Sequence, residues 1–486
     1  MLGWLRKHTA NTACLGTAVE PGDHRLLAPA TFLRSEYSAG RTHPGNVEKT
    51  LVIATIFINH FGTPVDWFLT NTGSASGPTS NPVLVFGTLA MVGVLSLGLV
   101  GNGEATFRVL ATEPLVPALF FLLALSPLWS DHFAASVNGV INVVLMGLFA
   151  TILLVRFELG QIIQLAAVAM TIGIAMDLFW VLAMGEYGRN SVGHWDGLGT
   201  QKNELGGHAL IALLVLLVAA RTAGTRRFMY YGLSGVTAVL IVGSQSKTAL
   251  AAGVLSSLCL LVFVVFRSRK TLFGAVLLSI SSASVIAVLF VTANIGLIAG
   301  WLDRDITFTG RSQLWSLVRT GISDRLWFGY GYDGFFNGPL SAAHPISAQA
   351  DWAPTHAHNA YMQMTLHVGV VGLAIFVAFT LRTIGRATNC SRLVPGALGL
   401  LPLVYLTTTI LVSFTESGVF AQRFGLVLLL VVTVSAKTQV DLREAALAAR
   451  KAKVNDATNL GPEEAATAID LSQDNRDTSL DLISSP

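Results

Sequence analysis

Charged side chains are scarce in this sequence. Asp, Glu, Lys and Arg make up 12% of its 486 residues, whereas hydrophobic residues make up 52% and the mean hydropathy is +0.61. This composition excludes a soluble domain of ordinary size. We therefore expect an all-α, polytopic integral membrane protein.

Cysteine is also rare, occurring only at Cys14, Cys259 and Cys390. None of the three lies in the polar stretch 301–361, so a disulfide cannot hold that stretch together. Its order must come from packing on the membrane domain. An apolar run is likewise missing before residue 51, so we expect no cleavable signal peptide and insertion through the first span.

Long apolar runs, by contrast, are abundant. A span needs about 20 mostly apolar residues, and about twelve segments qualify: 51–69, 83–101, 115–129, 136–155, 161–184, 205–220, 228–243, 249–266, 272–299, 361–381, 394–413 and 419–436. We predict a cytoplasmic N-terminal segment, 1–48, a polytopic membrane domain, 49–436, and a cytoplasmic tail, 437–486. Residues 437–453 favour a short basic helix on the inner leaflet, and the acidic tail is predicted to be disordered after 454.

Lys and Arg are unevenly distributed between the two sides that such a topology creates. With the N-terminus inside, 23 of the 31 basic residues fall on the cytoplasmic side and 8 on the opposite side. Basic residues accumulate in cytoplasmic segments. We therefore predict that both termini are cytoplasmic and that one large loop, 300–360, faces the outside.

Within this loop, residues 309–323 have a helical pattern. Leu314, Trp315, Val318 and Ile322 share one apolar stripe with Arg311. In one interpretation, Arg311 snorkels to water from an interfacial helix. In the other, the apolar face docks on the membrane domain while Arg311 and the first-turn N–H groups bind a phosphate.

Two further segments place basic residues on the same side. Lys247 lies in GSQSKTAL (243–250), which resembles a P-loop only superficially, because Ser246 replaces the glycine before the lysine and the segment faces away from cytosolic ATP. Lys247 either anchors a span at the interface or serves a substrate. The segment 185–204 carries Arg189 and Lys202 with groups suited to a sugar ring, although it could also simply connect two spans.

The loop also contains histidines, and His358-Asn359 directly precedes an apolar run. An imidazole at that place can accept a proton from an attacking hydroxyl. The pair His356 and His358 also suggests a metal, but no acidic or thiol ligand stands nearby at a recognisable spacing, so we predict none. The DxD at 303–305 is interpreted as a solvated loop feature, because nucleotide sugars are absent outside the cell.

Several motifs together resemble the O-antigen ligase and polymerase superfamily, and most closely its ExoQ-like exopolysaccharide polymerases. They are LSPLWS (125–130), GTQKNELG (199–206), SQSKTAL (244–250), TGRSQLW (309–315), WFGYGYDGF (327–335), HAHNAYMQMTLHVGVVG (356–372) and FTESG (414–418). The resemblance implies a bacterial inner membrane protein with a periplasmic active site that acts on glycans carried by undecaprenyl diphosphate.

The same resemblance implies roles for individual residues. His358 would be the general base, and Arg311 and Lys247, helped by Lys202, would neutralise the departing diphosphate. Supporting roles would fall to His356, Asn359, Glu416 and Arg189. The implied reaction is a metal-independent glycosyl transfer without a cofactor, with inversion at the anomeric carbon. Lys247 stands where similar ligases usually have Arg, which favours a polymerase.

Alternative functions stay open. A polymerase would join a lipid-linked oligosaccharide donor to a lipid-linked acceptor, whereas an O-antigen ligase would transfer the glycan to a lipid A core. Asp66 and Asp177, in or near apolar segments, would instead suit a lipid-linked glycan transporter or flippase. The expected partners are these glycans, membrane lipids and a chain-length regulator, and no nucleic acid.

Overall fold

The computed structural model describes residues 44–61, 82–190, 192–199, 201–266, 311–336, 354–416 and 423–458. Apart from one isolated β-bridge, between Arg189 and Trp195, every regular element in these ranges is a helix. The α-helices are α3 Asn46–Phe61, α5 Pro82–Ser96, α6 Gly103–Thr112, α7 Leu115–Leu125, α8 Phe133–Arg156, α9 Leu159–Ala183, α10 Lys202–Thr222, α11 Arg227–Ser244, α12 Lys247–Phe266, α15 Arg311–Asp324, α17 Ala360–Leu393, α18 Gly396–Ser413 and α20 Arg423–Thr458. Short 3-10 helices occur at Leu97–Leu99, Ser126–Trp129, Gly185–Tyr187 and Gly224–Arg226.

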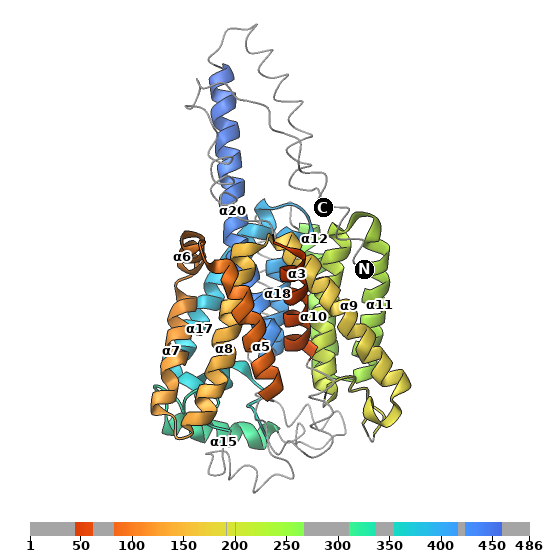
Figure 1. Ribbon diagram of the computed structural model, residues 1–486, viewed down its shortest axis with the longest axis vertical. Helices are drawn as coiled ribbons and strands as arrows, with labels where there is room; N and C mark the ends of the chain where they lie inside the picture. The colour runs from red at the N-terminus through yellow and green to blue at the C-terminus, as the bar shows by residue number, and fades with distance from the viewer. Residues whose placement is uncertain are drawn as a thin grey trace.

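Most of these helices stand side by side in one bundle (Figure 1). Helix α15 lies across one end, at which the connection between α9 and α10 also lies. We call this the α15 end. The short helix α6, which is bent by 109° from the helix before it, and the projecting half of α20 lie at the opposite end.

The prediction of a polytopic helical membrane protein is confirmed, whereas the number of spans is not fixed. Six of the described helices, α8, α9, α10, α17, α18 and α20, are long and apolar enough to cross a membrane. A bent pair, Gly87–Leu99 with Gly103–Thr112, raises the number to seven if it counts as one span. The predicted span 83–101 overlaps this bent pair, and 115–129 and 249–266 overlap the shorter apolar helices Leu115–Trp129 and Lys247–Leu258. The predicted spans 51–69 and 228–243 overlap α3 and α11. The part of 51–69 after Phe61 and the span 272–299 lie outside the described residues.

The core of the bundle is formed by α8, α9, α10 and α20. Apolar side chains in these helices are fully buried, among them Phe149, Ile163, Val215 and Val431, each 0% exposed. Small residues let the helices approach closely; an added Cβ at Gly173 would overlap the ring of Phe61 on α3. Close backbone approach of this kind is how helices associate in lipid, where the hydrophobic effect between spans is weak.

The long helix α17 is broken inside the bundle, at Val368 and Gly369, where φ and ψ leave the helical region. The turn-rich segment 325–336 fills the break: Tyr330 N donates to Leu366 O at 2.7 Å, and Val370 N donates to Leu326 O at 2.9 Å. Gly369 has φ of +67°. An added Cβ there would overlap the carbonyl of Trp327, so the backbones meet where only glycine fits.

The C-terminal region differs from the prediction. Residues 437–453 do not form a separate helix, because α20 continues without a break from Arg423 to Thr458. It thereby extends past 454, where disorder was expected, and projects from the bundle (Figure 1). Lys437 and Asp441, one turn apart on α20, form an ion pair at 2.8 Å, which is a spacing that supports a helix in water.

Candidate active site

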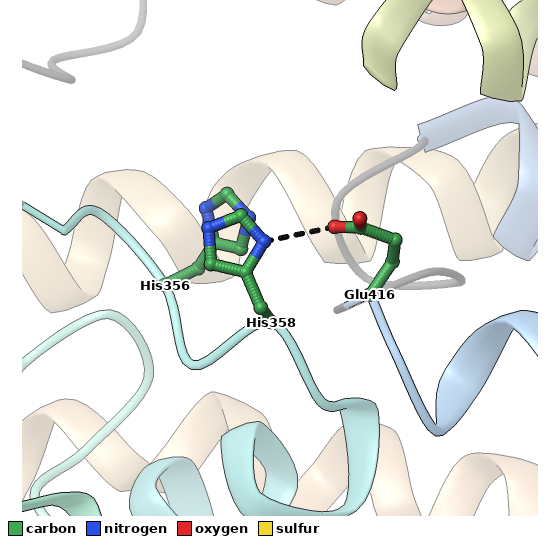
Figure 2. Close-up of side chains that lie close together, drawn as sticks. All are labelled: His356, His358 and Glu416. Atoms are coloured by element: carbon green, nitrogen blue, oxygen red, sulfur yellow. Dashed lines mark hydrogen bonds and ion pairs between the residues drawn. The ribbon is translucent and has the colours of Figure 1, made fainter. Parts of the chain in front are cut away.

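His358 lies in the segment 354–359, which leads into α17. Its Nδ1 is 2.9 Å from Oε2 of Glu416, which follows α18, and the two side chains face each other (Figure 2). They are 12% and 18% exposed, so the pair is shielded but reachable from water. An ionised carboxylate only accepts hydrogen bonds, so Nδ1 carries the hydrogen and Nε2 the basic lone pair. The arrangement is that of a general base oriented by a carboxylate.

Asn359 fixes this pair from both sides. Its Oδ1 caps α17 by accepting hydrogen bonds from the N–H groups of Tyr361 and Met362, each at 3.0 Å. Its Nδ2 donates to the carbonyl of Phe414 at 3.1 Å, and Phe414 lies just before Glu416. One side chain therefore holds the segments of His358 and of Glu416 together. The backbone of His358 has φ of +48°, a strained conformation that is found preferentially at functional sites.

The peptide groups of Ala357 are held by two different helices. Trp315 Nε1, on α15, donates to the carbonyl of Ala357 at 2.9 Å, and the N–H of Ala357 donates to Gln363 Oε1, on α17, at 2.7 Å. Gln363 Nε2 lies 2.6 Å from Nε2 of the buried His367. Our sequence reasoning missed Gln363 and His367. The available signal was two polar residues, four apart, in an otherwise apolar run.

The predicted docking of α15 is confirmed for its apolar side. Leu314 and Val318 are 1% and 0% exposed and pack with Tyr330, Phe335 and Leu366. Burial raises the pKa of the Tyr330 phenol, whose hydroxyl donates to the carbonyl of Gly321 at 3.0 Å. Helix α15 begins at Arg311. The Arg311 side chain, the DxD at 303–305 and His344 lie outside what the structure describes.

Lys202 and Lys247 are brought together by the starts of two neighbouring helices. Lys202 opens α10 and Lys247 opens α12. Ser246 Oγ donates to Asn203 Oδ1 at 3.0 Å, which joins the residues next to each lysine. Lys247 is exposed, and Lys202 Nζ is 3.4 Å from Nδ1 of His194. The two helix N-termini add positive potential there, while Glu204, in the first turn of α10, and Asp196 place carboxylates beside Lys202.

Lys247 and Glu416 lie at similar depth in the bundle. Helices α12 and α18 contact each other through Thr408, which donates to Ser256 Oγ at 2.7 Å. Helix α18 runs toward the α15 end, because Phe414, which follows it, contacts Asn359 at that end. Helix α12 runs in the opposite direction, away from the α15 end. Lys247 and Glu416 each lie about 12–14 Å along the bundle from the Ser256 contact. The lysines and the His358 pair thus share the α15 end.

The segment 185–201 is held on the bundle by Asp177. Asp177, on α9, is 1% exposed and its Oδ1 accepts a hydrogen bond from Leu198 N at 2.9 Å. Burial also raises the pKa of Asp196 in this segment. Arg189 contacts α9 and its own segment: its Nε donates to the carbonyl of Val181, on α9, at 3.1 Å, and the guanidinium lies 5.8 Å from the Trp195 ring. No described contact joins Arg189 to the His358 pair.

His356 stacks against His358. Their ring centroids are 4.0 Å apart with 42° between the planes, and both rings lie on the same side of the segment (Figure 2). One ligand atom from each of His356, His358 and Glu416 can be chosen so that all three lie within 4.8 Å of one another. No acidic residue lies near His356 and His358 in the sequence, but the fold brings Glu416 next to them as a third potential ligand.

The comparisons with known proteins point to one family. Residues 232–377 match the family model described as O-antigen ligase; this range contains Lys247, Arg311, His356 and His358. Over 227 residues the chain is 26% identical to the exopolysaccharide production protein ExoQ of Rhizobium meliloti (strain 1021). That match covers 42% of this chain and 50% of the relative, so the chain spans about half the length of the curated relative it matches. The protein is therefore a multi-pass membrane protein whose residues 232–377 match the O-antigen ligase family model, and it shows distant homology to an exopolysaccharide production protein.

Proposed function

We propose that this protein is a glycosyltransferase that polymerises undecaprenyl-diphosphate-linked oligosaccharide repeats into exopolysaccharide at the periplasmic face of the bacterial inner membrane. The observation that carries this proposal is the His358 and Glu416 pair, 2.9 Å apart. It supplies an oriented base at one end of a membrane bundle. The O-antigen ligase domain supports transfer of a lipid-linked glycan, and the ExoQ homologue supports exopolysaccharide.

In this mechanism, an acceptor sugar hydroxyl attacks the anomeric carbon of the donor. His358 Nε2 takes the hydroxyl proton, a bond forms between the acceptor oxygen and the anomeric carbon, and the bond to undecaprenyl diphosphate breaks. Glu416 stabilises the imidazolium that forms. A single displacement inverts the configuration at the anomeric carbon.

The departing diphosphate needs positive charge. Lys247 and Lys202, at adjoining helix N-termini, and Arg311, at the start of α15, are the groups we assign to it. Fixed cations aimed at the developing charge do there what a divalent ion does in other transferases, so the reaction needs no metal. His356, Asn359 and Glu416 support the base by contact, whereas Arg189 has no assigned contact with it.

The ligase alternative differs only in the acceptor. The family description, O-antigen ligase, favours it, whereas the printed name of the homologue favours exopolysaccharide synthesis. Both reactions release undecaprenyl diphosphate from the donor, and a ligase transfers the glycan to a lipid A core. A polymerase would instead lengthen a lipid-linked chain, so the identity of the lengthened product separates the two functions.

The transporter alternative depended on buried acids such as Asp177. In the structure Asp177 accepts a hydrogen bond from the backbone N–H of Leu198 and so holds the segment 185–201 on the bundle. This structural role explains the buried carboxylate without a transported proton. This observation favours the enzyme over the transporter.

The decisive experiment measures glycan chain length in a null strain that produces wild type, His358→Ala or Asp177→Asn at equal membrane levels. We expect single lipid-linked repeats with His358→Ala, because loss of a general base lowers a rate by about 10²–10⁴-fold. We expect polymer with Asp177→Asn, because an amide oxygen still accepts from Leu198. Full polymer with His358→Ala would refute the base assignment, and loss of polymer only with Asp177→Asn would support transport.

A further inference from the structure

We infer that His356, His358 and Glu416 form a binding site for a transition-metal ion such as Zn²⁺, and that the bound ion inhibits the enzyme. Its ligands are two imidazoles and one carboxylate, a donor set that zinc proteins use with a fourth position left for water. The inference of binding stands on geometry alone. The inference of inhibition rests on the proposed function, because it concerns the same base.

The spacing of the three residues suits one ion. Zinc bonds of about 2.0–2.2 Å place tetrahedral ligand atoms about 3.3–3.5 Å apart. The ligand atoms of the trio lie within 4.8 Å of one another, and His358 Nδ1 and Glu416 Oε2 are 2.9 Å apart. Shifts of about an ångström would therefore complete the site. Side-chain rotation can supply them, because none of the three side chains is fully buried.

The fold already holds these ligands close together. The ring centroids of His356 and His358 lie 4.0 Å apart with the planes tilted by 42°. A divalent ion between these rings and Glu416 would balance the charge of the carboxylate. The backbone is already ordered by Asn359, which joins α17 to the end of α18, so binding orders little further chain.

Inhibition follows from the chemistry of imidazole. If the ion binds Nε2 of His358, the lone pair that should accept the acceptor's proton is occupied. If the ion binds Nδ1 instead, the ring hydrogen moves to Nε2, and the lone pair at Nε2 is lost again. Metal and substrate proton therefore compete for His358 whichever nitrogen the ion takes. The ion would be an inhibitor rather than a cofactor.

Binding can be tested directly with the full chain, purified in nanodiscs without a polyhistidine tag. Co²⁺ serves as a coloured substitute for Zn²⁺, and Zn²⁺ affinity is then measured by competition. We expect one Co²⁺ per chain with the visible absorption of a tetrahedral site, displaced by Zn²⁺. His356→Ala and Glu416→Gln should each weaken binding at least about tenfold.

His132→Ala is the matched control. His132 precedes α8, outside the trio, and its removal should leave the affinity unchanged. Glu416→Gln keeps an oxygen that can accept from Nδ1, so it removes a ligand with little change of shape. Equal binding by wild type, His356→Ala and Glu416→Gln would overturn the site, as would the lack of a tetrahedral Co²⁺ spectrum in folded wild-type protein.

The inhibition is measured separately, as polymer formation by wild-type protein with EDTA and with Zn²⁺. We expect full activity in EDTA, loss of activity at the Zn²⁺ concentration that fills the site, and recovery when EDTA is added back. Binding without inhibition would overturn the inhibitory role and leave the site. A failure of the proposed function would appear elsewhere, as polymer made by His358→Ala with metal binding by wild type intact.

Discussion

His358 depends on contacts from three separate parts of the chain. Glu416 faces its Nδ1 at 2.9 Å, Trp315 holds the carbonyl of the preceding residue, and Asn359 caps the helix that follows. The contact with Glu416 restricts rotation of the imidazole ring, and the other two contacts restrict the backbone on either side of His358. A base that is held in this way loses little entropy when the acceptor hydroxyl arrives.

Glu416→Gln tests the charge of this pair separately from its geometry. The amide oxygen still accepts from Nδ1, but it no longer stabilises the imidazolium that forms during transfer. We expect the turnover rate to fall by about ten- to a hundredfold, less than with His358→Ala, and the apparent substrate affinity to stay near wild type. The measurement is the rate of polymer formation with purified protein at saturating and limiting substrate.

The matched control is Asp131→Asn, which alters another carboxylate at the α15 end. Asp131 pairs with Arg325 at 2.6 Å and is largely exposed, and such pairs contribute about 1 kcal/mol or less. Turnover in this variant should therefore stay near wild type. Equal losses in both variants would mean that Glu416 has no special role.

At the scale of elements, the break in α17 positions the site. The segment 325–336 enters this break and packs with α15 around Tyr330 and Phe335. His367, just before the break, makes an edge-to-face contact with Tyr332, with 4.3 Å between the ring centroids, and its Nε2 lies 3.5 Å from Oδ1 of Asp333. Gln363 links His367 to Ala357: its Nε2 contacts Nε2 of His367, and its Oε1 accepts a hydrogen bond from the N–H of Ala357. The segment 325–336 and the segment that carries His358 are therefore one packed unit.

Gly369→Ala tests this unit. At φ of +67° and ψ of −169° a Cβ is strained, at a cost of about 1–3 kcal/mol, and its overlap with the Trp327 carbonyl adds about 1–3 kcal/mol more. We expect a clear loss of thermal stability in detergent or nanodiscs, with loss of polymer in cells. The measurement is the melting temperature of the purified protein.

Gly385→Ala is the control for this change, since Gly385 lies in the same helix with nothing within 4 Å of an added Cβ. Alanine there should be neutral or should stabilise by about 0.5–1 kcal/mol. If both variants melt like wild type, position 369 does not require glycine and the break in α17 tolerates a Cβ.

At the scale of the whole molecule, the two ends of the bundle differ in charge and in use. The candidate site residues lie at the α15 end. The opposite end carries basic residues that pair across helices, as in Arg156 with Glu48 at 2.8 Å and Arg386 with Glu113 at 2.7 Å. Because basic residues favour the cytoplasmic side, we expect the α15 end to face the periplasm.

Single cysteines introduced into a cysteine-free variant test this orientation. Ser323, on α15, and Thr225, in the connection between α10 and α11, are exposed at opposite ends. A membrane-impermeant maleimide added to spheroplasts should label Ser323→Cys at once. Thr225→Cys should react only after the membrane is permeabilised. The reverse pattern would place the site in the cytoplasm and invalidate the periplasmic reaction.

The sequence by itself determined the class of molecule and supplied the residues from which the candidate site is proposed. Composition and apolar runs require a polytopic helical protein, because a bilayer admits few other ways to satisfy the backbone. The periodicity of residues 309–323 predicted the buried side of α15, and the place of His358-Asn359 directly before an apolar run suggested His358 as the candidate base. These features are local, so they can be read from neighbouring residues.

Only the tertiary structure decided which residues meet. Glu416 lies far from His358 in the chain, and no local pattern measures that separation in space; the pairing exists because α17 and α18 pack side by side and Asn359 joins their ends. The same applies to the lysines at the starts of α10 and α12, and to the loop that fills the break in α17. Whether an ion can bind is likewise decided by the fold, because its three ligands come from two segments that meet only when the bundle forms.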